Sequence, residues 1–389
     1  MGHRVGKIAL TGANGNIGSA LTRYLSETKR LEVVAVCRNS SGAASLSHIA
    51  CEKRIGSIAD PIIAKKLIGD CEIVVNCAFD RGLPRTSKII NQNIIYNIAR
   101  LEKITNVVLL STVALYGTLV HDGNVYFHSP RPDTHYGKLK RALEKYAIKM
   151  VSQAYKQFYI LRVGHVYGPH QWLSKAIFET IKSEGVALPF NGGRPSNAIH
   201  IDNLTSGIYE LIFNSPESGI YNFTDYPQRS WREIYDRHTK VLNEPPVPGM
   251  DDGKSELQFN KYLKIYRRSI YARAVLDLVS WLKAIPFQNL MQLGSLRGVI
   301  FIILSHSPLA LERVMKLIYD RWSAKKKVLK LSEQRLIPDP CFFCLEVPGP
   351  YLAIPKFSDV IVHNSDQELK SWLQGLGCVG ESHRLFKNS

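Results

Sequence analysis

The strongest indication of the fold lies in residues 7–18, KIALTGANGNIG. Its apolar opening predicts a buried strand, and the apolar positions within residues 17–25 predict the helix that follows. The turn between them has the pattern Thr-Gly-x-x-Gly-x-x-Gly. In such a turn Gly12 permits the sharp reversal, Gly15 lets a pyrophosphate approach the backbone, and Gly18 lets the helix pack close to the strand. We therefore expect a phosphate-binding turn, in which free N–H groups at the helix N-terminus face the anion.

The composition indicates a folded chain that is large enough for two domains. Of the 389 residues, 45% are hydrophobic and 21% are charged, which predicts a packed core rather than disorder. No run reaches the roughly 18–20 uninterrupted apolar residues that span a bilayer, and the first strand starts too early for a signal peptide. Seven cysteines are scattered along the chain, and Cys341-Phe-Phe-Cys344 has no second pair at zinc spacing. We expect a cytoplasmic protein without a metal site.

Positive charge is concentrated towards the C-terminal end. The formal net charge is +17, and between Lys254 and Lys330 fifteen Lys and Arg residues stand against four Asp and Glu residues. We interpret 253–335 as a basic, amphipathic helical extension. Two interpretations of 257–330 stay open: peripheral binding to an anionic membrane surface on the inner face of the cytoplasmic membrane, or an extra helical layer or homodimer contact. Nucleic acid ranks low as a partner, because no binding module is visible.

The end of the second predicted strand bears on the choice of cofactor. The apolar run 31–37 ends about 20 residues after the glycines, where an Asp or Glu would bind the ribose hydroxyls of NAD. This chain has Arg38, Asn39 and Ser40 instead. An arginine pairs well with a 2′-phosphate, and its two polar neighbours add hydrogen-bonding groups. The pattern favours NADP(H) over NAD(H) and leaves both open.

Strands and helices alternate through the first half of the chain. Apolar runs at 72–78 and 106–110 predict strands, and residues 86–103 predict a helix. A shorter helix is expected to begin near Pro61, and another to end near Gln153. This alternation predicts an α/β protein with a Rossmann-type, doubly wound parallel sheet and right-handed crossovers.

Three side chains suited to proton transfer follow the strand at 106–110. Thr112 lies just after that strand, whereas Tyr136 and Lys140 lie one helical turn apart on one face of a helix. A free tyrosine has a pKa of about 10, and a neighbouring ammonium group favours its phenolate form. Tyr136 would then take a hydroxyl proton or return one to a ketone, while Thr112 holds the reacting oxygen.

Six landmarks occur in order within residues 5–240. After the glycine turn they are Asn76-Cys-Ala78, Ser111-Thr-Val-Ala-Leu-Tyr-Gly117, Tyr136-Gly-Lys-Leu-Lys140, Leu161-Arg-Val-Gly-His-Val-Tyr-Gly-Pro169 and Ala198-Ile-His-Ile-Asp-Asn203. With these landmarks the chain resembles the extended short-chain dehydrogenase/reductase superfamily, in its NAD(P)-dependent epimerase/dehydratase group. Members of that group work mostly on nucleotide sugars.

The resemblance implies roles for a set of residues. Catalysis would rest on Thr112, Tyr136 and Lys140, with Asn93 as a proton relay, and Lys140 would also hold the nicotinamide ribose. The cofactor, NADP or NAD, would contact Gly12, Asn14, Gly15, Asn16, Ile17, Gly18, Arg38, Asn39, Ser57, Ile58, Cys77, Ala78, Phe79, Tyr136, Lys140 and Val163. The substrate, a nucleotide sugar, would contact Val113, His165, Trp172, Arg194 and Ser196.

Departures from the family pattern bear on the adenine site, the substrate site and the reaction. Gly56-Ser57-Ile58 stands where the family usually has Gly-Asp-Leu, so an acidic contact to the adenine is missing. His165 replaces a common Asn, and Ser196 holds the place of an Arg that the nearby Arg194 would have to supply. Residues 113–114 are Val-Ala, where a dehydratase usually has an acidic pair. The pattern therefore argues against dehydration.

The expected function is that of an NAD(P)-dependent oxidoreductase or epimerase acting on a hydroxyl or keto carbon of a nucleotide-activated sugar. Two alternatives stay open. The basic extension would suit a membrane-associated dehydrogenase of a lipid-like or steroid-like alcohol. A cofactor-sensing protein without catalysis is the other, although such a sensor would not need Thr112, Tyr136 and Lys140.

The second half of the chain is expected to hold the smaller, substrate-binding part. Helices are predicted over 172–184 and 200–214, a strand over 220–223, and a helix that starts at Ser230 with the pattern of a capping box. The expected segments are a dinucleotide-binding domain at 1–170, a substrate-binding part at 171–252 with a strand returning to the sheet near 198–223, the basic extension at 253–335, and a Pro-rich tail at 336–389 with a short helix over 366–376.

Overall fold

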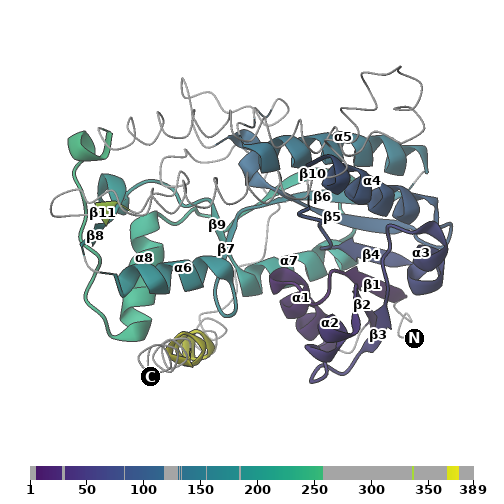
Figure 1. The fold of residues 1–389 in the computed structure, drawn as a ribbon, viewed down its shortest axis with the longest axis horizontal. Coiled ribbons are helices and arrows are strands. Elements are labelled where there is room, and N and C mark those ends of the chain that lie inside the picture. Colours follow the sequence, from purple (N-terminus) through teal and green to yellow (C-terminus); the bar gives the residue numbers. More distant parts are fainter. Residues whose placement is uncertain are drawn as a thin grey trace, which may run out of the picture.

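A seven-stranded parallel sheet forms the centre of the structure, a computed structural model (Figure 1). The structure describes residues 6–28, 31–82, 84–117, 130, 132, 134–154, 156–183, 185–256, 335–336 and 366–375. The strand order is β10-β6-β5-β4-β1-β2-β3, and every neighbouring pair is parallel. The strands are β1 (Lys7–Thr11), β2 (Glu32–Cys37), β3 (Glu52–Ile55), β4 (Ile73–Asn76), β5 (Asn106–Thr112), β6 (Gln157–Val163) and β10 (Gly219–Phe223).

The order of the strands reverses between β1 and β4. At such a switch point, parallel sheets of this kind bind ligands beyond the carboxyl ends of their strands. The glycine turn follows β1 at this edge, and Thr112 ends β5 one strand beyond β4. The doubly wound fold expected from the sequence is confirmed.

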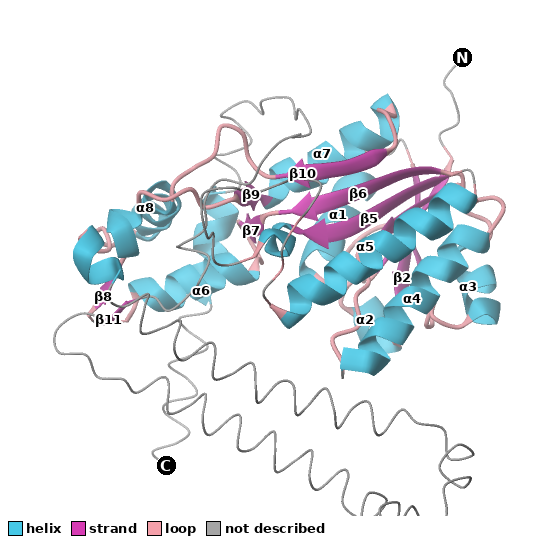
Figure 2. Ribbon diagram, turned by 90° about the horizontal axis from the view of Figure 1, so that it is seen from above, coloured by secondary structure: helices cyan, strands magenta, loops and turns pink. Residues whose placement is uncertain are grey.

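Helices cover both faces of the sheet (Figures 1 and 2). The face with α1 and α7 opposes the face with α3, α4 and α5. Side chains alternate along each strand, so Ile8 and Leu10 point into the core under α1 and α7, whereas Ala9 points into the core under α3, α4 and α5. The helices are α1 (Asn16–Glu27), α2 (Ser40–Ala44), α3 (Pro61–Ile68), α4 (Pro84–Arg100), α5 (His135–Gln153) and α7 (Ile201–Asn214).

Short polar side chains set where the helices begin. The Asp60 carboxylate accepts from the Ile62 N–H at 2.9 Å, with Pro61 in the first turn of α3. Thr134 accepts from the Gly137 N–H at 3.0 Å, and this cap places Tyr136 in the first turn of α5. Caps of this kind stabilise a helix by about 1 kcal/mol each.

A smaller part follows β6. Here β7 (His165–Tyr167) pairs with β9 (Ala198–His200), and α6 (Trp172–Ile181) and α8 (Trp231–Leu242) pack around Trp231. The expected capping box of Ser230 and Glu233 opens α8. A further pair joins β8 (Val186–Ala187) to β11 (Arg335–Leu336). Of the strands within 198–223, β10 returns to the main sheet, whereas β9 pairs with β7.

The structure also contains elements that the sequence did not predict. The strand β3 has the sequence EKRI and lies at the edge of the sheet, and α2 is five residues long. Charged side chains hold β3: Arg54 pairs with Asp70 at 2.5 Å, and Lys7 pairs with Glu52 at 2.9 Å. An edge strand fastened by ion pairs needs no apolar alternation, so periodicity does not reveal it.

Several sequence expectations fall on other parts of the chain. The basic segment 257–330 and the Cys341–Cys344 pair lie outside the described residues. Within the described ranges, none of the helices has both the length and the apolar character of a bilayer span. The short helix expected near the C-terminus is present at 366–375.

Candidate active site

The glycine turn packs tightly on one side and is open on the other. Gly12 has φ +66°, and a Cβ there would lie 2.7 Å from the backbone nitrogen of Ala78. A Cβ at Gly18 would lie 2.2 Å from the carbonyl oxygen of Gly12. At Gly15, by contrast, an added Cβ would meet only that same oxygen, at 3.3 Å. The backbone next to Gly15 is therefore accessible to a ligand.

The first turn of α1 presents backbone donors to this open space. Gly15 is the N-cap residue and offers no side chain to cap the helix. Asn14 and Asn16 are exposed, and Ile17 is half-buried. Uncapped N–H groups at a helix N-terminus, together with the helix dipole, favour an anion. The turn thus fits the pyrophosphate of a dinucleotide.

The residues expected to select the cofactor lie at the ends of β2 and β3. Arg38 is 79% exposed, with Nη1 at 3.9 Å from Oδ2 of Asp80. Asn39 accepts from the Gly42 N–H at 2.9 Å and so caps α2. After β3, Ser57 is exposed and Ile58 is buried. Of these residues, Arg38 is the charged one, and its exposed side chain follows β2 at the same edge of the sheet as the glycine turn.

Thr112, Tyr136 and Lys140 meet at the carboxyl end of β5. Thr112 is paired in register with Val163 of β6, its hydroxyl accepts from the Ala114 N–H at 3.2 Å, and it lies close enough to Tyr136 to act on the pKa of that phenol. The ammonium group of Lys140 donates to the carbonyl oxygen of Leu110 at 2.9 Å. It lies 5.9 Å from the centre of the Tyr136 ring. The three residues that the sequence selected for proton transfer are therefore neighbours.

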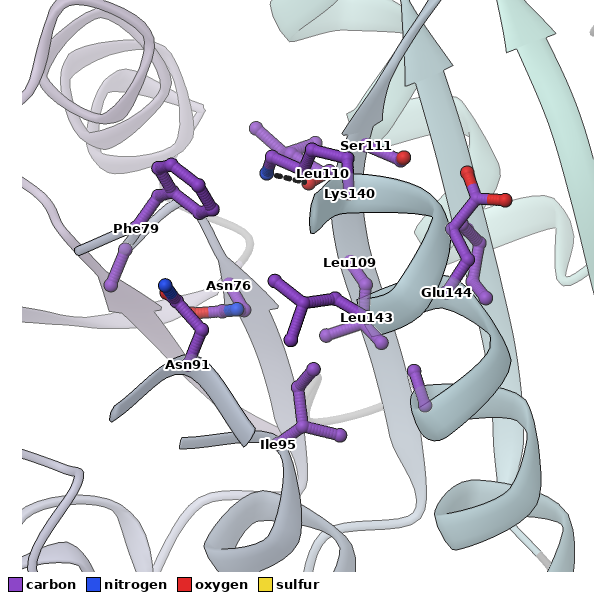
Figure 3. Close-up of a pocket in the computed structure, with 13 residues that line it drawn as sticks. Asn76, Phe79, Asn91, Ile95, Leu109, Leu110, Ser111, Lys140, Leu143 and Glu144 are labelled. Carbon is purple, nitrogen blue, oxygen red and sulfur yellow. Dashed lines mark hydrogen bonds between the residues drawn. The ribbon is translucent and has the colours of Figure 1, made fainter. Parts of the chain in front are cut away.

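The Phe79 ring contacts both the tyrosine and the lysine. It meets the Tyr136 ring edge to face, with centroids 5.5 Å apart, and the Lys140 ammonium lies 4.2 Å from its centre. Figure 3 shows Phe79 and Lys140 above a pocket that Asn76 and Asn91 also line. Asn91 accepts from the Asp80 N–H at 3.0 Å, which fixes the backbone just after the ring.

Burial and neighbouring charges shift the acid–base properties of this cluster. Burial raises the pKa of Tyr136, while the positive charge of Arg81 and the nearby Thr112 hydroxyl act to lower it. Burial also lowers the pKa of Lys140 to about 8, partly offset by the carboxylate of Glu144. The sequence reasoning had not singled out Arg81, which follows β4 close behind Phe79.

Asn93, the expected proton relay, does not join this cluster. Its side chain is exposed on α4, two residues beyond Asn91. Two residues correspond to about 200° around a helix, so the two asparagines face nearly opposite directions. Asn91 is the one that lines the pocket.

The expected substrate contacts differ in how accessible they are. Trp172 is 65% exposed at the start of α6, and the Arg194 guanidinium lies 4.2 Å from the centre of the Phe190 ring. The His165 ring packs against Trp231 at 5.8 Å. Ser196 is 1% exposed and donates its hydroxyl to the carbonyl oxygen of Arg229.

Ser196 therefore lies in the interior of the smaller part, and Val113 is also buried, at 6% exposure. Trp172 and Arg194 have accessible polar or aromatic groups that a substrate could contact.

A buried polar network behind the site was missed from the sequence. Arg162 of β6 is 3% exposed and pairs with Glu144 of α5 at 2.9 Å. Arg162 also donates to the Tyr116 hydroxyl at 2.9 Å, which in turn donates to Asn222 at 2.8 Å. The available signal was an arginine within an otherwise apolar strand, since a buried charge requires a partner.

Comparison with known proteins places this geometry in a family context. The dTDP-D-glucose 4,6-dehydratase of Dictyostelium discoideum is 23% identical over 255 residues. That match spans 57% of this chain and 58% of the relative's length.

Solved structures show the same fold. UDP-glucose 4-epimerase from Thermotoga maritima superposes with a TM-score of 0.51 at 18% identity, over 63% of this chain and 85% of that one. For dTDP-glucose 4,6-dehydratase from Bacillus anthracis the TM-score is 0.52 at 18% identity, over 65% and 90%.

The sequence itself carries the family signature. A profile of the NAD dependent epimerase/dehydratase family matches residues 8–222, which is more than half of the chain. The match includes the glycine turn, Thr112, Tyr136 and Lys140. The chain belongs to the NAD dependent epimerase/dehydratase family.

Proposed function

We propose that the protein is an NAD(P)-dependent oxidoreductase or epimerase that acts on a hydroxyl or keto carbon of a nucleotide-activated sugar. The observation that carries the proposal is the cluster of Thr112, Tyr136 and Lys140 at the strand edge that also bears the open glycine turn. The named substrates of the similar proteins, dTDP-D-glucose and UDP-glucose, support the substrate class.

Tyr136 and Thr112 would handle the proton of the reacting hydroxyl. Both residues lie at the carboxyl end of β5 and close to one another, so their hydroxyl groups would together hold a substrate oxygen. Tyr136 then takes the substrate proton, or returns one to a ketone, as the carbon is oxidised or reduced. The nicotinamide cofactor, when bound, accepts or supplies the hydride.

Lys140 and Arg81 would favour the phenolate form of Tyr136. Burial raises the pKa of Tyr136, so a nearby positive charge is needed to offset it. Arg81 lowers that pKa directly. Lys140 is held by Leu110 and the Phe79 ring. With a pKa of about 8 it is charged at pH values below about 8, where it adds to the positive field.

We propose epimerisation or keto-reduction rather than dehydration. The 3₁₀ turn directly after Thr112, η1 (Val113–Tyr116), has the sequence VALY and contains no carboxylate. Loss of water from a sugar requires a group that protonates the leaving hydroxyl. No acidic side chain occupies this turn to do so.

A nucleotide-sugar panel tests the proposed function. The purified protein is incubated with UDP- and dTDP-hexoses and their keto forms, together with NAD, NADH, NADP or NADPH. Absorbance of the reduced nicotinamide reports net oxidation or reduction, and chromatography of the released sugars reports epimerisation. Conversion of at least one member is expected. A protein that binds a dinucleotide yet converts no member by either readout would overturn the proposal.

We further propose that NADP(H) is preferred, through Arg38. A charge-assisted hydrogen bond contributes about 1.5–3 kcal/mol, so Arg38→Ala should weaken NADPH binding by about tenfold or more. NADH binding should stay unchanged, because no 2′-phosphate is present. Fluorescence titration with both dinucleotides measures this, and Arg100→Ala, an exposed arginine on α4, is the matched control. Equal weakening of both dinucleotides would contradict the proposed role of Arg38.

A further inference from the structure

The helix at 366–375, called the tail helix below, packs against the body of the protein although the family profile ends at residue 222. Its Leu369 and Leu373 are 1% and 0% exposed. They lie one turn apart, so they form one apolar stripe on the helix. Gln367 and Gln374 are exposed on its other side. The tail helix is therefore amphipathic and buries its apolar side on the protein.

Polar contacts fasten the tail helix to three different elements. Glu368 lies 3.0 Å from Arg23 of α1 and 3.4 Å from the His170 ring nitrogen. Asp366 lies 2.7 Å from Arg237 of α8. Trp372 adds a ring contact to His170, with centroids 5.2 Å apart.

These contacts span both parts of the molecule. Figure 1 shows the tail helix in yellow between α8 of the smaller part and α1 of the main sheet. The loop 168–171 lies where the chain passes from the main sheet and β7 into α6. The tail helix thus bridges the two parts at the loop that joins them.

The same loop also contacts the glycine turn. The amide of Gln171, which is 2% exposed, donates to the carbonyl oxygen of Asn16 at 3.3 Å. Its neighbour His170 has φ 59°, a left-handed conformation that costs free energy for a residue other than glycine. Such a conformation persists where surrounding contacts hold it, and Glu368 and Trp372 supply contacts to His170.

We propose that α1, loop 168–171 and α8 form a docking surface for the tail helix, and that docking holds this loop against the glycine turn and so strengthens dinucleotide binding. The path runs from Glu368 and Trp372 through His170 to Gln171, and then to Asn16. The inference rests on the proposed function only in that a dinucleotide binds the glycine turn. Linkage requires the reverse effect as well, so the dinucleotide also stabilises the docked tail helix.

A charge reversal in the full-length chain tests the docking. Glu368→Lys places a cation beside Arg23 and His170 and should release the tail helix. Gln367→Lys introduces the same residue at the neighbouring exposed position and is the matched control. Amide hydrogen exchange follows residues 366–375 and 168–174, and fluorescence titration measures the Kd values for NADH and NADPH.

Faster exchange is expected in both segments of Glu368→Lys, with no change in Gln367→Lys. The Kd of the tighter dinucleotide should rise about fivefold or more, the lower end of couplings between separate sites. In the unaltered protein, bound dinucleotide should slow exchange in the tail helix. The double variant Arg23→Glu/Glu368→Lys should recover part of the affinity, because it restores an opposite-charge pair.

Release of the tail helix with unchanged exchange in 168–174 and an unchanged Kd would overturn the proposal. Unchanged exchange in the tail helix of both Glu368→Lys and Leu373→Asp would also overturn it. A dimer that dissociates in Glu368→Lys would show that the docked helix comes from a second copy of the chain, which contradicts docking within one chain. Turnover is not a readout of this test. A protein that binds dinucleotide but lacks activity would therefore contradict the proposed function and leave the docking proposal standing.

Discussion

Tyr136→Phe is expected to lower turnover about 10²–10⁴-fold, the contribution typical of a positioned acid–base group. The substitution removes one hydroxyl and leaves the ring that packs edge to face on Phe79. Cofactor affinity should therefore change little, because the glycine turn and Lys140 are untouched. The measurement is kcat on whichever nucleotide sugar the panel identifies, together with the dinucleotide Kd by fluorescence titration.

A matched control separates the loss of a proton-transfer group from the loss of any tyrosine hydroxyl. Tyr96→Phe removes the hydroxyl of a tyrosine on α4 that is 37% exposed and accepts a hydrogen bond from Arg100. Turnover of that variant should equal that of the unaltered protein. If Tyr136→Phe keeps most of its turnover, another group moves the proton, and the proposed mechanism fails even where the enzyme class survives.

Much of the fold follows from local patterns in the sequence. The apolar run before Gly12 and the three glycines specify β1, the turn and α1, and the structure has all three. Two helix starts are predicted by residues close together in the sequence. At α3, Asp60 caps the helix and Pro61 occupies its first turn, and at α8, Ser230 and Glu233 form a capping box. Local interactions of this kind are legible from sequence because the partners are three residues apart or fewer.

The candidate site is predictable where spacing along one element decides it. Tyr136 and Lys140 share a helix face at a separation of four residues, and Thr112 lies at the end of an apolar strand. The choice between Asn91 and Asn93 was not predictable to the same degree, because it depends on the rotation of α4 about its axis. That rotation is set by packing against the sheet.

Contacts between distant segments were beyond the sequence reasoning. Glu368 and Arg23 are 345 positions apart, and the residues around either one do not predict the other as its partner. The same holds for Arg162, whose partners Glu144 and Tyr116 come from α5 and η1. An arginine in an apolar strand predicts that a partner exists, but the fold decides which carboxylate it is.

Arg162→Met is expected to lower the free energy of unfolding by about 3–5 kcal/mol, the cost of removing one partner of a buried ion pair. Arg162 and Glu144 are 3% and 6% exposed. Without the guanidinium, the buried Glu144 carboxylate loses its ion-pair partner, and Tyr116 loses a donor. Thermal or chemical denaturation measures the loss, and Arg100→Met, at an exposed position on α4, should change stability by less than about 0.5 kcal/mol.

The double variant Glu144→Leu/Arg162→Met distinguishes a buried charge from a simple loss of packing. Replacing both members of a buried pair by apolar residues is often close to neutral, so the double variant should be more stable than Arg162→Met alone. Equal or additive destabilisation would show that packing volume, and not the uncompensated carboxylate, causes the loss. Because Glu144 lies on α5 one turn after Lys140, and Tyr116 follows Thr112 in η1, Arg162 ties to β6 both segments that carry the proposed catalytic residues. Recovery of stability in the double variant would therefore mean that Arg162→Met loses stability through the unpaired Glu144 carboxylate, and that apolar packing can hold these two segments on the sheet in place of the ion pair.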